Sequence, residues 1–222
     1  MSYFLVIISF LVALLASFNV NRTYKKYSQM MNRRGYTADQ IARMILDQNG
    51  LYNVAIERVS GSLTDHFDPN ANVIRLSDSV YGKTSAAAIG VAAHECGHAV
   101  QYAEQYSPMK IRSAIIPITN IGSNLAYPLV ILGIILGGFR PLITIGIWLF
   151  IAVVAFQLIT LPVEFNASGR AMKTLEQSGY LDDDELAQSK KVLTAAALTY
   201  VAALFTAIAQ LIRLVAISDR RN

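Results

Sequence analysis

Four long runs without a charged residue do most to limit what this chain can fold into. They cover residues 3–20, 113–139, 141–163 and 192–212. A helix that spans a bilayer needs about 20 mostly apolar residues, so each run is long enough to cross. Only 15% of the chain is charged, against about 25% in soluble domains, and the remaining residues could not cover four such helices. The sequence therefore predicts a mainly α membrane protein with four transmembrane helices.

The expected segments alternate between lipid and water. Several basic residues closely follow the first run and none precedes it, which is unlike a signal peptide, so we interpret this run as a retained anchor. The two polar segments are small, and we expect them to pack together. Transmembrane helices are expected at 1–20, 113–139, 141–163 and 192–217, and polar segments at 21–112 and 164–191.

The distribution of charge predicts an orientation. Of the 19 lysines and arginines, 15 lie in the two polar segments, so the positive-inside rule places these segments on the cytoplasmic side of a cell membrane. Arg220 and Arg221 at the C-terminus argue the other way. The single cysteine, Cys96, cannot form an internal disulfide, which agrees with a cytoplasmic-facing domain, and we expect it to be a small buried side chain. No basic stripe is interleaved with aromatic residues, so nucleic acid is not an expected partner.

Local patterns in the first polar segment predict a small α+β unit. Thr37 and Gln40 are spaced as a capping box, so a helix should begin there, and Gly50 should end it. Partly alternating apolar and polar residues favour short strands. Strands are expected at 52–59 and 72–77, turns at 60–62 and 65–70, and a second helix from Ser85.

That second helix carries the clearest chemical motif, His94-Glu95-Cys96-Gly97-His98. Residues four apart lie on one face of a helix, so the two imidazoles could hold one zinc ion. Glu95 would then stand beside the metal as a base rather than as a ligand. The alternative is a helix that happens to carry two surface histidines.

A third zinc ligand is needed, because catalytic zinc usually has three protein ligands. The chain returns to the same side of the bilayer after its second and third runs, at Glu164. Pro162 suits the first turn of a helix, which would place Glu164 near the start of a new helix. A carboxylate there either binds the metal or interacts with the helix dipole, and the spacing leaves both alternatives open.

Three segments carry a family resemblance. Residues 85–101, 164–168 and Gly179-Tyr180 resemble the membrane-embedded gluzincin metallopeptidases, which include the HtpX and CAAX prenyl endopeptidases. Residues 64–69, Thr-Asp-His-Phe-Asp-Pro, are similar to a stretch in the YugP-type neutral zinc metallopeptidases of bacterial membranes. The resemblance covers nearly the whole chain. It implies a zincin-like (gluzincin) catalytic domain, one Zn²⁺ per chain, and Glu164 as the third ligand.

Two further residues are expected near the metal. Ser168 stands where the wider group has an aspartate that orients a zinc histidine, and a serine can accept a hydrogen bond without bringing charge. Arg170, like Tyr180, is a candidate donor to the carbonyl oxygen of a substrate; alternatively, Arg170 pairs with an acid such as Glu176 or Asp182.

These parts predict peptide hydrolysis. Zinc would polarise the scissile carbonyl and activate water, and Glu95 would act as general base before passing the proton to the leaving amine. The carbonyl oxygen needs a further donor, for which His66 is the first candidate. Alternatively, His66 is a turn histidine bonded to Asp65 or Asp68.

The substrate is expected to be a polypeptide. It would add as a strand along an open edge formed by Val73, Ile74, Arg75 and Leu76, unless that strand is internal and fully paired. Because the site is held at the lipid bilayer, we expect membrane or membrane-associated substrates. Whether a regulatory membrane protein also binds is left open by the sequence. The alternative function is a non-catalytic zinc-binding membrane scaffold. A transporter would need charges inside the spans, and only Arg213 comes close.

Overall fold

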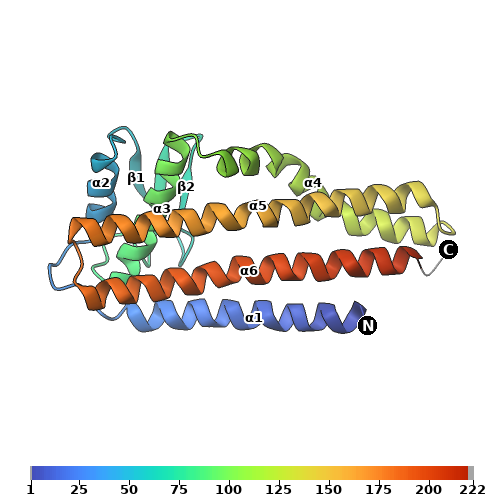
Figure 1. The fold of residues 1–222 in the computed structure, drawn as a ribbon, viewed down its shortest axis with the longest axis horizontal. Coiled ribbons are helices and arrows are strands. Elements are labelled where there is room, and N and C mark those ends of the chain that lie inside the picture. Colours follow the sequence, from blue (N-terminus) through green and yellow to red (C-terminus); the bar gives the residue numbers. More distant parts are fainter. Residues whose placement is uncertain (1, 220–222) are drawn as a thin grey trace. The chain divides into compact units, whose positions relative to one another are not determined.

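The computed structural model describes residues 2–219 as four long helices, two shorter helices and a three-stranded sheet (Figure 1). Internal contacts divide the chain into two compact units. We call them the membrane unit, Met1–Ser17, Ser107–Pro162 and Leu198–Asn222, and the polar unit, Phe18–Tyr106 and Val163–Ala197. The residues that the sequence assigns to zinc and catalysis all belong to the polar unit.

The four long helices are α1 (Ser2–Tyr27), α4 (Ser107–Ile135), α5 (Arg140–Ser178) and α6 (Asp183–Asp219). Each is long and apolar enough to cross a membrane, which confirms the prediction of four candidate spans. The helices continue past the uncharged runs, because polar residues outside lipid can still extend a helical hydrogen-bond ladder. The two C-terminal arginines that argued against the predicted orientation, Arg220 and Arg221, lie outside the described residues.

Prolines interrupt the long helices less than expected. Pro162 lies inside α5, so the third run and the segment with Glu164 form one continuous helix, and the prediction of a new helix at Pro162 is wrong. Membrane helices tolerate proline because neighbouring groups satisfy the freed carbonyls. Pro117 and Pro128 likewise lie inside α4, which begins at Ser107. Its second half departs from the direction of its first half (Figure 1), as expected of proline kinks.

Within the membrane unit, glycines allow α4 and α5 to pack closely. A Cβ atom built on Gly146 would lie 2.7 Å from the Ala126 carbonyl oxygen, and one on Gly133 would lie 2.7 Å from the Ile143 side chain. Small residues at such contacts are typical of membrane helices. Gly137, by contrast, lies in the turn between the two helices with φ +75°, so it shapes the turn and not the contact.

The polar unit begins with α2 (Ala38–Gln48), followed by β1 (Ala55–Val59), β2 (His66–Asp68), β3 (Val73–Ser77) and α3 (Ala86–Ala103). Both parts of the predicted capping box at Thr37 and Gln40 are present, and Gly50 has φ +72° just past the helix end. The expected strands are present in shortened form. The stretch expected only to turn, 65–70, contains β2 as well, because three residues there pair with β3.

The strand with the expected substrate edge is internal, so that prediction is wrong. The sheet order is β1-β3-β2, with β1 parallel and β2 antiparallel to β3. Val73, Ile74 and Leu76 are at most 2% exposed, and the Arg75 side chain pairs with Asp68 at 2.8 Å. The local sequence pattern predicts a strand here, but the position of that strand in the sheet depends on its pairing with β1 and β2.

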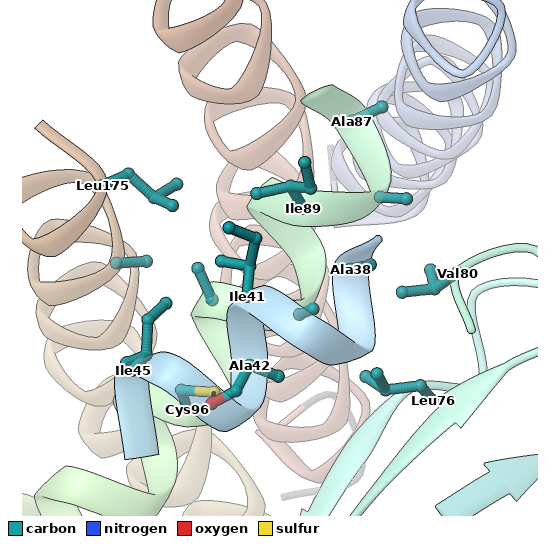
Figure 2. Packing of buried hydrophobic residues seen from close by; sticks show 14 of the residues in the cluster. Ala38, Ile41, Ala42, Ile45, Leu76, Val80, Ala87, Ile89, Cys96 and Leu175 are labelled. Atoms are coloured by element: carbon teal, nitrogen blue, oxygen red, sulfur yellow. Dashed lines mark hydrogen bonds between the residues drawn. The ribbon is translucent and has the colours of Figure 1, made fainter. Parts of the chain in front are cut away.

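The core of the polar unit lies between α2, α3, the sheet and α5 (Figure 2). Ile41 of α2 points toward Ile89 of α3, and Ile45 of α2 and Leu175 of α5 belong to the same cluster (Figure 2). Cys96 is fully buried there, with its sulfur 3.5 Å from the Ala42 carbonyl oxygen. This confirms the expectation of a buried cysteine, and burial raises the pKa of its thiol.

Candidate metal centre

Helix α3 is fixed at its start by two hydrogen bonds. The Ser85 hydroxyl accepts from the Ala88 backbone N–H at 3.2 Å, which is an N-cap at the position expected from the sequence. Ser189 of α6 donates its hydroxyl to the Ala86 carbonyl at 2.7 Å. His94 and His98 lie roughly two and three turns further along, so both are held on a helix whose start is fixed.

Gly97, a free position within the motif, lets α5 approach α3. A Cβ atom built there would lie 2.6 Å from the Ala167 carbonyl oxygen and 3.2 Å from the Ala167 Cα. Real Cβ contacts are longer, so only glycine fits without a shift of backbone. Ala167 lies one helical turn after Glu164, so this approach brings the carboxylate to the histidines.

Two imidazoles and one carboxylate converge between α3 and α5. His94 Nε2 lies 3.3 Å from Glu164 Oε2, and His98 Nε2 lies 3.5 Å from the same oxygen. The two rings meet edge to face, with centroids 4.7 Å apart. Glu164 is only 2% exposed. Among the described residues, these three form the one cluster of histidine, cysteine or acidic ligand atoms close enough to hold a metal ion, with all such atoms within 4.8 Å of one another.

The donor set and its spacing fit zinc. Tetrahedral bonds of about 2.0–2.2 Å hold ligand atoms roughly 3.3–3.5 Å apart, and the two measured separations lie in that range. Two histidines and one glutamate leave the fourth position open, as in catalytic zinc sites. The residues present therefore suit the metal that the sequence predicts.

The other nitrogen of each imidazole has its own partner. His94 Nδ1 lies 3.1 Å from the Ser168 hydroxyl, so the structure places Ser168 at the position expected of an orienting group. His98 Nδ1 lies 3.0 Å from Gln101 Oε1. Sequence reasoning missed Gln101, although its place three residues after His98 on a helix is a signal that could have found it.

Glu95 is buried beside the metal group at 7% exposure. Burial raises the pKa of its carboxyl group. The nearby imidazoles of His94 and His98 oppose this effect, and the carboxylates of Asp65 and Glu164 add to it. Burial alone would lower the pKa of His98, but Glu164 and Glu95 raise it overall. A bound cation would favour the charged carboxylate and the neutral imidazoles that binding requires.

His66 is the first residue of β2 and is exposed. Its Nδ1 lies 2.9 Å from the Thr64 carbonyl oxygen, so the partner of the ring is a backbone group and not Asp65 or Asp68. Asp65 instead accepts from the Ser77 backbone N–H and hydroxyl at 2.7 and 2.9 Å. These bonds tie the start of β2 to the end of β3.

Arg170 pairs with a different acid from those expected. Its Nη1 lies 2.7 Å from Glu104 at the end of α3, and its Nε donates to Asn166 Oδ1 at 2.7 Å. The expectation of a partner such as Glu176 or Asp182 is therefore wrong, because α5 turns Arg170 toward α3. Asn166 also accepts from Gln101, so Arg170 reaches the metal group only through other residues.

Tyr180 and the acidic residues at 182–185 make their contacts away from the three candidate ligands. The Tyr180 hydroxyl accepts from Gln48 Nε2 of α2 at 2.6 Å. Asp182 and Asp184 pair with Arg33 at 2.9 and 2.8 Å. These hydrogen bonds lower the pKa of the Asp182 carboxyl group. Arginine is thus the observed partner of these two acids.

Comparisons with known proteins agree with the chemistry of this site. Residues 2–219 match the family described as "Putative neutral zinc metallopeptidase". The chain is 48% identical over 214 residues to "Putative membrane protease YugP" of Bacillus subtilis (strain 168), covering 96% of this chain and 95% of that relative. No solved structure matches. With a family match along nearly its entire length and a relative of this similarity, the chain belongs to the neutral zinc metallopeptidase family.

Proposed function

We propose that the protein is an integral-membrane zinc metalloendopeptidase with a zincin-like site. The observation that carries this proposal is the convergence of His94, His98 and Glu164 on one point, with Glu95 buried beside them. Helices long enough to span a bilayer and a similar membrane protease support the membrane setting.

His94, His98 and Glu164 would hold the zinc ion, which, when bound, polarises a carbonyl and makes water more acidic. Glu95 takes a proton from the attacking water while the water oxygen forms its bond to the carbonyl carbon. As the C–N bond breaks, Glu95 delivers that proton to the leaving nitrogen. Burial of Glu95 excludes bulk water from this transfer.

His66 stays the first candidate for a donor to the carbonyl oxygen. Its Nδ1–H is directed to the Thr64 carbonyl oxygen, so a neutral ring offers Nε2 only as an acceptor. His66 would donate to the substrate only when it is protonated, so its part in the reaction requires the imidazolium form.

The proposed edge for substrate binding is β2 and not β3. β2 lies at the end of the sheet order and next to α3, where Phe67 meets Tyr102 with ring centroids 5.9 Å apart. Tyr102 lies one turn after His98 on the same helix face. An extended polypeptide could therefore add to the outer side of β2 while its scissile bond faces the metal group.

Membrane or membrane-associated polypeptides are the proposed substrates, with the site on the cytoplasmic side. The helix that carries Glu164 is also one of the candidate spans, so the site cannot move far from the bilayer. The basic residues of the polar segments support the orientation. The contact between Ser168 and His94 supports an orienting role for this serine in place of an aspartate.

Elemental analysis combined with a cleavage assay tests the proposal. The full chain, purified in detergent, should contain zinc and cleave a detergent-solubilised membrane polypeptide, with activity lost on chelation and restored by zinc. A protein that holds zinc but yields no chelator-sensitive cleavage products would support the scaffold, and one without zinc would refute both.

A further inference from the structure

We propose that Gln101 is a positioning residue that sets both the His98 imidazole and helix α5 for metal binding. The inference rests on the proposed zinc site. Gln101 is fully buried and lies three residues after His98 on α3. One end of its amide contacts His98 and the other contacts α5 beside Glu164, and neither contact follows from the zinc motif itself.

The oxygen end selects the tautomer of the neutral His98 ring. Gln101 Oε1 lies 3.0 Å from His98 Nδ1, and an amide oxygen can only accept. A neutral His98 therefore carries its proton on Nδ1, and its Nε2, on the side of Glu164, is left with the lone pair that a metal ion requires. A ligand histidine generally needs such a partner to hold its tautomer and ring orientation.

The nitrogen end holds α5. Gln101 Nε2 donates to the Val163 carbonyl oxygen at 2.8 Å and to Asn166 Oδ1 at 2.9 Å. Because both partners at this end are acceptors, the end must be the NH₂ group of the amide, and the other end, which contacts His98, must be its oxygen. Val163 directly precedes Glu164, so the same side chain that orients His98 also fixes the backbone beside the third ligand.

A surface pair holds the far end of this network. Arg170 Nε donates to Asn166 Oδ1 at 2.7 Å, and Arg170 Nη1 lies 2.7 Å from Glu104 Oε2. Asn166 Oδ1 is thus held by two donors, from α3 and from α5. The network runs from the exposed end of α3 to His98, and its members sit on both helices that supply zinc ligands.

Zinc affinity separates this role from simple packing. Gln101→Met keeps the length of the side chain and removes both polar ends, while Gln177→Met makes the same change at an exposed position of α5. We expect Gln101→Met to raise the zinc dissociation constant by about 10–100-fold, measured by chelator competition on the full chain in detergent. The visible spectrum of the cobalt-substituted protein should change as well, and Gln177→Met should match the parent in both.

A third variant tests the bond to His98. Gln101→Glu retains an acceptor for His98 Nδ1, so it should keep more zinc affinity than Gln101→Met. Parental zinc affinity and cobalt spectrum in Gln101→Met would overturn the proposal, as would equal losses in both Gln101 variants. If Gln101→Met does not fold, zinc affinity is measured on Asn166→Ala instead. Weaker zinc binding in a variant that melts at the same temperature as the parent supports the network, and unchanged zinc binding overturns it.

The same measurements keep this inference apart from the proposed function. A parent protein that binds no zinc would refute the metal site and the role of Gln101 together. A parent that binds zinc tightly but cleaves nothing would refute the peptidase reaction alone, because the affinity and spectral comparisons of the Gln101 variants need no turnover.

Discussion

At the scale of single residues, Glu95 separates metal binding from chemistry. It is buried beside the ligands but is not one of the three converging groups. We expect Glu95→Gln to retain zinc and to lose about 10²–10⁴-fold in the rate of hydrolysis, because an amide cannot take the proton. Zinc content and turnover measured on the same preparation check this. Parental turnover in that variant would contradict the role of general base.

Glu164 makes the opposite prediction. Glu164→Ala removes a ligand, so the zinc dissociation constant should rise by more than the roughly 10–100-fold typical of losing an outer partner. Glu176→Ala, at an exposed position of the same helix, is the matched control. Equal zinc stoichiometry in the two variants would remove Glu164 from the ligand set.

The same scale shows what could be predicted for the site. A spacing of four on a helix was enough to pair His94 with His98, because that geometry is local. Glu164 could be identified as a ligand only from the family resemblance, because the spacing also allowed an acid at the start of a helix. That alternative required a helix break at Pro162, and α5 is continuous there. Gln101 stayed hidden because a glutamine near a helix end has many possible partners, and only the position of α5 selects one.

At the scale of elements, the contact between α3 and α5 sets the site. Gly97→Ala would place a methyl group 2.6 Å from the Ala167 oxygen and should cost about 1–3 kcal/mol of stability, with weaker zinc binding. Gly169→Ala meets nothing within 4 Å and should leave the stability unchanged or raise it slightly. Melting temperatures of the two variants, with and without zinc, test this. Equal melting temperatures would mean that α3 and α5 can separate at little cost.

A second element contact predicts a pH dependence. Arg33 hydrogen-bonds Asp182, which lowers the pKa of that carboxyl group. The stabilisation is therefore complete above the ordinary aspartate pKa of about 3.9 and is lost as pH falls through the lower folded value. Asp182→Asn should slightly lower the melting temperature at neutral pH and have less effect under acid conditions. Asp183→Asn is the control, and an effect of Asp182→Asn that does not shrink as the pH is lowered would contradict the pairing.

Elements also mark where sequence patterns stop being sufficient. The spans, α2 and α3 follow from runs, caps and periodicity, which are properties of neighbouring residues. The order β1-β3-β2 could not be read the same way, because β3 is central only through pairing with strands on either side of it. β2 was taken for part of a turn because three residues are too few to show an alternating pattern.

At the scale of the whole molecule, the orientation can be tested with one engineered thiol at a time. Cys96 is fully buried, so the parent should react little with a membrane-impermeant maleimide. A cysteine at exposed Ser62, in the polar unit, should be labelled only in inverted vesicles, and one at Phe139, between α4 and α5, only in intact cells. The reverse pattern would contradict a cytoplasmic site.

Helix α5 runs unbroken from Arg140 to Ser178, so the chain from the glycine turn to Glu164 is a single helix. A residue inserted into or deleted from a helix shifts the positions that follow it by about 100° and about 1.5 Å relative to those before it. We therefore expect length variation among related chains to collect in the glycine turn at Gly137 and Gly138, and the distance in sequence from that turn to Glu164 to be invariant.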